Sequence, residues 1–157
     1  MCESIARLPY TAAADVERAE AALFEFAGKP ATNTDRLGLA KGFEALVRLQ
    51  RNIRRPGARV IDTLAELVRR SPARPGPDLL RDARVRRLAL ESLILLEAAD
   101  APTVLAASAD PDMQVRRLAV RAAALDGPDA VVTRALNDPA AMVRIEALRA
   151  AHQKNAA

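Results

Sequence analysis

The side chains that most often perform catalysis or hold metals are scarce in this chain. Among its 157 residues there is one cysteine, Cys2, and one histidine, His152. Nucleophilic catalysis needs a Ser, Cys or Lys beside a base, and the only histidine lies near the end of the chain, where we expect a solvent-facing position. A metal would have to bind carboxylates alone, because no set of Cys and His residues exists. The residues predict no catalytic centre, no metal site and no cofactor.

Carboxylate pairs and glycines also have structural explanations. A pair such as Asp110 and Asp112 lies at an expected helix start, where capping accounts for it. The six glycines are scattered and form no phosphate-binding loop. Gly38 and Gly42 lie within an expected helix, where small residues permit close packing. The chain by itself is therefore not expected to be an enzyme.

The abundance of arginine is the one feature of the composition that could bear on function. The net charge is only +4, but residues 48–87 hold twelve arginines against four acids. Arg48, Arg51 and Arg55 project away from the apolar side of an expected helix, and Arg59 follows just beyond its end. Such a surface could bind nucleic acid, an anionic membrane or an acidic protein.

Two features weigh against nucleic acid as the ligand of these arginines. Aromatic residues make up 3% of the chain, so few side chains could stack on bases. Arginine also outnumbers lysine by 21 to 3, which is typical of a bias across the whole composition. Solvation alone is the commoner role of exposed arginines, and binding to a nucleic-acid backbone stays as an alternative function.

An internal repeat indicates which elements position these residues. A Val-Arg pair occurs at 85–86, 115–116 and 143–144, with spacings of 30 and 28 residues. Apolar residues follow at helical intervals of three and four, as at Val115, Leu118, Ala119 and Ala122 in the second copy. After a break, a shorter apolar segment follows at 103–109 and at 130–136. Each unit is therefore expected to be a pair of antiparallel helices.

An Asp-Pro pair precedes the second and the third Val-Arg helix, as Asp110-Pro111 and Asp138-Pro139. Asp suits the N-cap of a helix and Pro suits its first turn. We therefore expect both pairs to begin helices.

The first 70 residues follow the same style less regularly, with helices expected near 12–28, 35–53 and 58–70. The middle helix should begin at a cap formed by residues 33–35. Its apolar side should carry Leu39, Phe43, Leu46, Val47 and Ile53. Three prolines in residues 71–78 predict a loop, which we interpret as a connection between repeats and not as a domain boundary.

The pattern Asp-x-x-Val-Arg-x-x-Ala followed by a second helix resembles the HEAT repeat, most closely the short bacterial form called HEAT-like or phycobilisome-lyase-type. The resemblance covers residues 80–152 well and the first 70 only in style. It implies an all-α fold, a right-handed α-solenoid of stacked antiparallel helix pairs, in a single domain over residues 1–157. The matching residues are Asp82, Val85, Arg86 and Ala89, then Asp112, Val115, Arg116 and Ala119, and finally Val143, Arg144 and Ala147.

The resemblance also implies roles for particular residues. In that family Asp and Arg form a hydrogen-bonded ladder between neighbouring repeats. This role would fall to Asp82, Arg86, Asp112, Arg116 and Arg144. If the second helix of each unit lines the inner surface, the residues facing a ligand would include Asp129, Thr133 and Arg134.

These features together predict a non-catalytic scaffold that binds an unidentified protein partner. A second alternative is a repeat segment of a larger enzyme, because similar repeats accompany prolyl isomerases and form phycobilin lyases. No membrane span or signal peptide is evident, so a cytoplasmic location is the default expectation. Glu146 replaces a leucine of the earlier copies. It would make the last helix a polar cap, or else the array would continue in a longer protein.

Overall fold

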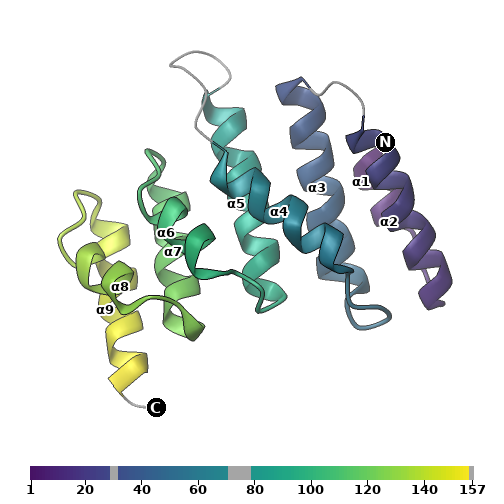
Figure 1. The fold of residues 1–157 in the computed structure, drawn as a ribbon. Helices are drawn as coiled ribbons and strands as arrows, with labels where there is room; N and C mark the ends of the chain where they lie inside the picture. The colour runs from purple at the N-terminus through teal and green to yellow at the C-terminus, as the bar shows by residue number, and fades with distance from the viewer. Residues whose placement is uncertain (29–31, 71–78, 156–157) are drawn as a thin grey trace.

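The computed structural model describes residues 1–28, 32–70 and 79–155, which form nine helices and no strand (Figure 1). The all-α fold class expected from the sequence is thereby confirmed. The helices are α1 (Cys2–Ala6), α2 (Ala13–Ala27), α3 (Asn33–Gln50), α4 (Ala58–Arg69), α5 (Leu79–Leu95), α6 (Ala101–Ser108), α7 (Met113–Asp126), α8 (Asp129–Ala135) and α9 (Ala141–Asn155).

The helices lie in two rows. In one row α3 contacts α5, α5 contacts α7 and α7 contacts α9, while α4, α6 and α8 form the other row in the same order. The rows meet through contacts such as α4 with α5 and α6 with α7. The helices α1 and α2 pack against α3, and the two ends of the chain lie at opposite ends of the molecule (Figure 1). None of the helices in the described ranges is long and apolar enough to cross a membrane.

Buried apolar side chains form two clusters along the rows. The larger one extends from α1 to α7, and the smaller one lies among α6, α7, α8 and α9. The interior of the molecule is thus extended along the rows, and neighbouring helix pairs share it.

The first half of the chain departs from the sequence expectations at helix ends. The expected cap at residues 33–35 is wrong by one residue, because α3 begins after Thr32, which forms a capping box with Asp35. The helix ends at Gln50 instead of near residue 53, so Ile53 leaves the apolar side and is 37% exposed. The short helix α1 was not expected. The loop predicted at 71–78 lies outside the described residues.

Close packing at Gly42 explains how α1 lies against α3. A Cβ atom added to Gly42 would lie 2.9 Å from Leu23 Cδ2 and 3.0 Å from Cys2 Cβ. The expected close packing is therefore present at this glycine. At Gly38 it is absent, because an added Cβ would meet no atom within 4 Å.

The Asp-Pro pairs do not begin helices, contrary to the prediction. The helix α7 begins at Met113 with Asp112 as its N-cap, and Asp112 accepts hydrogen bonds from the backbone N–H groups of Gln114 and Val115. The helix α9 begins at Ala141. Asp110 and Asp138 each lie in the loop before a helix, so their carboxylates are available for other contacts.

Candidate binding site between the last helical units

Arg86 joins two helical units through a buried hydrogen-bonded cluster. Its side chain lies on α5 and is 1% exposed. Nε and Nη2 donate to the two carboxylate oxygens of Asp110, at 2.5 and 3.1 Å, and Nη1 donates to Asp82 at 2.5 Å. A guanidinium paired side-on with a carboxylate has two nearly parallel hydrogen bonds, which fix orientation as well as distance. The cluster therefore fixes α5 relative to the loop that precedes α7.

Arg116 repeats this arrangement one unit later. Its Nε and Nη2 donate to Asp138 at 2.7 and 2.9 Å. Its Nη1 donates to the backbone carbonyls of Asp110 and Pro111, at 2.9 and 3.0 Å, in the loop before its own helix. Here the arginine is 15% exposed and the aspartate 10%. We call the Arg86–Asp110 and Arg116–Asp138 contacts the two Arg–Asp bridges.

The bridges perturb the pKa values of Arg86, Arg116 and Asp138. Burial by itself would lower the pKa of Arg86, but hydrogen bonds and charge from Asp110 and Asp82 outweigh that effect, and the net pKa is raised. The hydrogen bond from Arg116 lowers the pKa of Asp138, and the same bond raises the pKa of Arg116. The Arg116–Asp138 bridge is therefore an ion pair at neutral pH.

The remaining two residues expected in the ladder occupy other positions. Asp112 caps α7, as described above. Arg144 occupies the position of Arg116 in the next unit, and its Nη1 donates to the carbonyls of Asp138 and Pro139 at 2.8 and 3.0 Å. The structure thus brings Arg86 and Arg116 into the bridges, with Asp110 and Asp138 as the aspartates that connect units and Asp82 as a second partner of Arg86.

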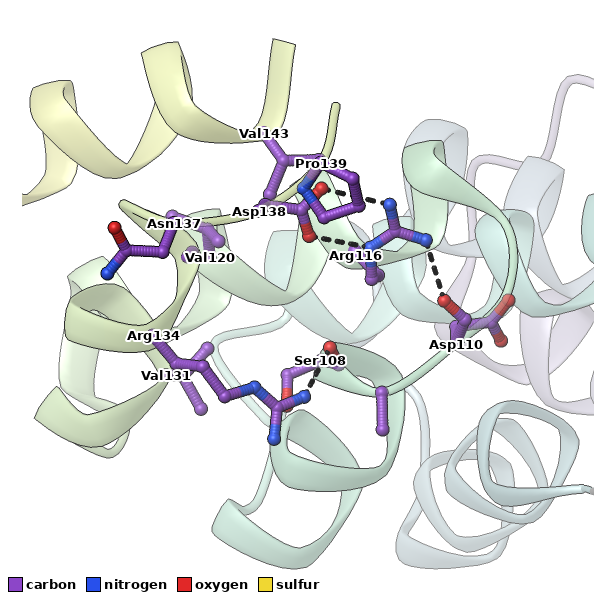
Figure 2. A pocket seen from close by; sticks show the side chains of 12 residues that line it. Ser108, Asp110, Arg116, Val120, Val131, Arg134, Asn137, Asp138, Pro139 and Val143 are labelled. Atoms are coloured by element: carbon purple, nitrogen blue, oxygen red, sulfur yellow. Dashed lines mark hydrogen bonds and ion pairs between the residues drawn. The ribbon is translucent and has the colours of Figure 1, made fainter. Parts of the chain in front are cut away.

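A cavity of about 380 Å³ lies beside the second bridge (Figure 2). Arg116 and Asp138 form one wall, and the loops before α7 and α9 border it. Val120, Val131 and Val143 contribute apolar surface from three different helices. The remaining lining residues are Ser108, Ala109, Asp110, Arg134, Ala135, Asn137 and Pro139.

Arg134 is the residue expected to face a ligand that does line this cavity. Its Nη2 donates to the carbonyl of Ser108 at 2.9 Å, and the residue as a whole is exposed (Figure 2). Asp129 and Thr133 are also exposed on α8 but lie apart from the cavity lining. Asp129 accepts from Lys154 Nζ at 2.5 Å, and the Thr133 hydroxyl donates to the carbonyl of Asp129.

The cavity combines an apolar interior with polar groups at its border. Arg116 and Asp138 satisfy each other, so the wall that they form does not need a ligand to compensate a buried charge. The exposed guanidinium of Arg134 can still donate hydrogen bonds to a carboxylate or carbonyl. Such a site suits a ligand with an apolar group and a hydrogen-bond acceptor beside that group.

The four arginines proposed for anion binding each contact another group within the protein. Arg48 Nε donates to Glu44 at 2.7 Å, and Arg51 donates to the carbonyl of Arg48. Arg55 donates to the carbonyl of Leu96, in the loop that follows α5. The guanidinium carbon of Arg59 lies 4.1 Å from the ring centroid of Phe24, in cation–π geometry. The structure therefore places them in four different environments.

The described residues contain no group of three or more His, Cys, Asp or Glu side chains placed to hold a metal ion. His152 is exposed on α9 and Cys2 is buried on α1.

Sequence reasoning assigned Asp110 and Asp138 to helix capping and so missed their part in the bridges. A signal was available, since these two aspartates are 28 residues apart, the same interval as between Val115 and Val143.

Comparison of the chain with family models, with curated proteins and with solved structures found no match.

Proposed function

We propose that this protein is a non-catalytic scaffold of HEAT-like repeats, arranged as a right-handed α-solenoid, that binds a protein segment. The cavity between α7, α8 and the loop before α9 carries this proposal. Its walls come from successive units, so its shape depends on how those units are held together.

The Arg116–Asp138 bridge supports this interpretation because it pre-organises one wall. A binding surface that is already ordered loses less conformational entropy when a ligand arrives. Val120, Val131 and Val143 line the cavity but are each at most 3% exposed, so a hydrophobic side chain of the partner would contact only a small part of their surface. Arg134 would then donate to a carboxylate or a backbone carbonyl next to it. The expected ligand is a peptide with an apolar residue beside an acceptor.

Selection from a displayed peptide library against the purified protein tests the proposal. Selected peptides should bind the unaltered protein in solution and should lose at least about tenfold in affinity to Arg134→Glu, since the charge reversal removes the donor and repels a carboxylate. Thr133→Glu is the control, because it places the same glutamate side chain on the same helix away from the cavity. Equal binding of the selected peptides to both variants and to the unaltered protein would refute the proposal.

Duplex DNA provides the competing outcome. Anisotropy of a labelled duplex is measured at low and moderate salt, with the protein and with a variant in which Arg48, Arg51 and Arg55 are changed to Glu. Binding to phosphates weakens steeply as salt rises. We expect no binding that depends on these three arginines. Salt-sensitive binding that the variant loses would replace the scaffold function with a nucleic-acid one.

A further inference from the structure

The three Val-Arg helices can be compared at equivalent positions. The residue four places after the arginine is Leu90 in α5, Val120 in α7 and Leu148 in α9. Leu90 is 0% exposed and Val120 is 1% exposed, and each belongs to an apolar cluster shared with the following unit. Leu148 is 62% exposed. The same position is therefore buried in α5 and in α7, but it is exposed in α9.

The guanidinium groups show the same difference. In Arg86 and Arg116 the edge formed by Nε and Nη2 holds an aspartate of the next unit. In Arg144 the Nη1 contacts match those of Arg116, on the carbonyls six and five residues earlier. Within the described ranges, no carboxylate bonds to the Nε and Nη2 edge of Arg144, and the residue is exposed. The arginine is thus exposed and is held by its own loop.

The surroundings of Arg144 on α9 are apolar and basic. Met142 and Ile145 are 45% and 42% exposed. Glu146, the only acid in α9, faces back toward α7, where its carboxylate lies 3.4 Å from Arg117 and 3.4 Å from Arg121. The interpretation of Glu146 as an outward polar cap is therefore wrong. No acid on α9 neutralises the outer face.

We propose that the outer face of α9 binds another protein through a helix whose preceding loop presents an aspartate to Arg144. The aspartate would receive Nε and Nη2, as Asp110 and Asp138 do in the two bridges. The helix would cover Leu148 with an apolar side chain, as α9 covers Val120. Charge complementarity favours an acidic loop, because Arg144 is exposed and the one acid of α9, Glu146, faces α7. Arg144 and Leu148 do not line the cavity at Arg134, although Arg144 donates to the carbonyls of two residues that do.

The probe is a fluorescein-labelled peptide of residues 127–155, because in this structure that segment already presents an aspartate, Asp138, to the equivalent arginine. The full chain should bind it in an anisotropy titration. Arg144→Gln in the protein and Asp138→Asn in the peptide should each weaken binding at least about tenfold, and together no more than either alone. Arg149→Gln, an exposed arginine on the same helix, is the control and should leave binding within about twofold.

A second arrangement ensures that weak affinity cannot hide the contact. A copy of residues 127–155 is appended to the end of the full chain, which raises its effective concentration. In this extended chain, each of two changes should lower the Tm by about 3 °C or more: Arg144→Gln, and Asp138→Asn in the appended copy. Their effects should not add when they are combined. In the parent chain, Arg144→Gln should lower the Tm by less than about 1 °C. Equal effects of Arg144→Gln on both chains overturn the proposal. A dimer of the parent chain that Leu148→Asp dissociates would assign this face to a second copy and also overturn it.

Discussion

The two halves of the molecule hold their helices together by different means. In the first half aromatic rings lie between helices: Phe24 of α2 and Phe43 of α3 have ring centroids 5.3 Å apart, and Phe43 is fully buried. In the second half the buried residues among α6, α7, α8 and α9 are small, chiefly Val and Ala, while leucines are buried around α5 and at Leu118 of α7, and the two Arg–Asp bridges connect the units. All four aromatic residues of the chain lie within its first 43 positions.

This difference shows how a core of small side chains obtains a defined geometry. Large rings fill shaped spaces, so a few of them can fix how helices pack. Valine and alanine side chains are smaller and less distinctive in shape, so their contacts define the register of neighbouring units less strongly. A bidentate arginine tolerates no such displacement. The bridges therefore supply the register that the apolar contacts of the second half leave undefined.

Removal of the central aromatic ring should give the largest loss of stability. Phe43→Ala should lower the free energy of unfolding by about 3–5 kcal/mol, because it empties a fully buried site next to Phe24. Equilibrium denaturation in urea measures this loss. Phe26→Ala is the control: Phe26 is only partly buried, and its replacement should cost less than half as much. Equal losses would contradict the special position of Phe43.

Asp110→Asn tests the buried bridge and should cost about 3 kcal/mol, because it leaves the charge of Arg86 only partly compensated by Asp82. The same denaturation measurement applies. Asp112→Asn, two residues away, should be nearly neutral, because asparagine caps helices as well as aspartate does. A neutral Asp110→Asn would show that the bridge does not hold the units.

The Arg116–Asp138 bridge should contribute less to the free energy of unfolding than the Arg86–Asp110 bridge. Asp138→Asn should lower the free energy of unfolding by about 1–2 kcal/mol. Its members are partly exposed, and Arg116 keeps two backbone carbonyls as partners. If this loss equals or exceeds that of Asp110→Asn, burial does not determine the strength of the bridges.

Acid should weaken the second bridge in a defined pH range. Because the folded-state pKa of Asp138 lies below its unfolded value of about 3.9, its contribution is complete above that value and is lost as pH falls through the folded pKa. The difference in free energy of unfolding between the protein and Asp138→Asn should therefore narrow below about pH 4. Denaturation curves at several acidic pH values measure it. A constant difference would mean that Asp138 stabilises without its charge.

The smallest effect is expected on the surface of the first half. Arg48→Gln breaks an ion pair with Glu44 whose arginine is 46% exposed, and it should change the free energy of unfolding by less than about 0.5 kcal/mol. A loss comparable to Asp138→Asn would contradict the contrast between surface pairs and Arg–Asp bridges.

The sequence predicted the helices of the second half because the Val-Arg interval repeats and the apolar residues keep helical spacing. Of the apolar positions expected on α7, Val115, Leu118, Ala119 and Ala122 are all buried. The aspartates of the bridges were harder to find, because Asp before Pro has the composition of a helix cap. Local preference alone does not distinguish a cap from a side chain that reaches the preceding unit.

The first half was less predictable for a different reason. The helix α1 has only five residues and no side-chain cap, so it has almost no local signal. Its position depends on Gly42, a contact with a helix about 40 residues later. The cavity at Arg134 could not be foreseen either, because its lining comes from four helices and the loops between them.

The short reach of the two bridges has a consequence for how the protein folds. They join residues 24 and 22 positions apart, so neither needs the closure of a long loop. Chains dominated by such local contacts reach the native state rapidly, on the order of microseconds to milliseconds. Each bridge can form as soon as two adjacent units exist. The second half can therefore acquire its structure progressively as it is synthesised, with each completed unit acting as the template for the next.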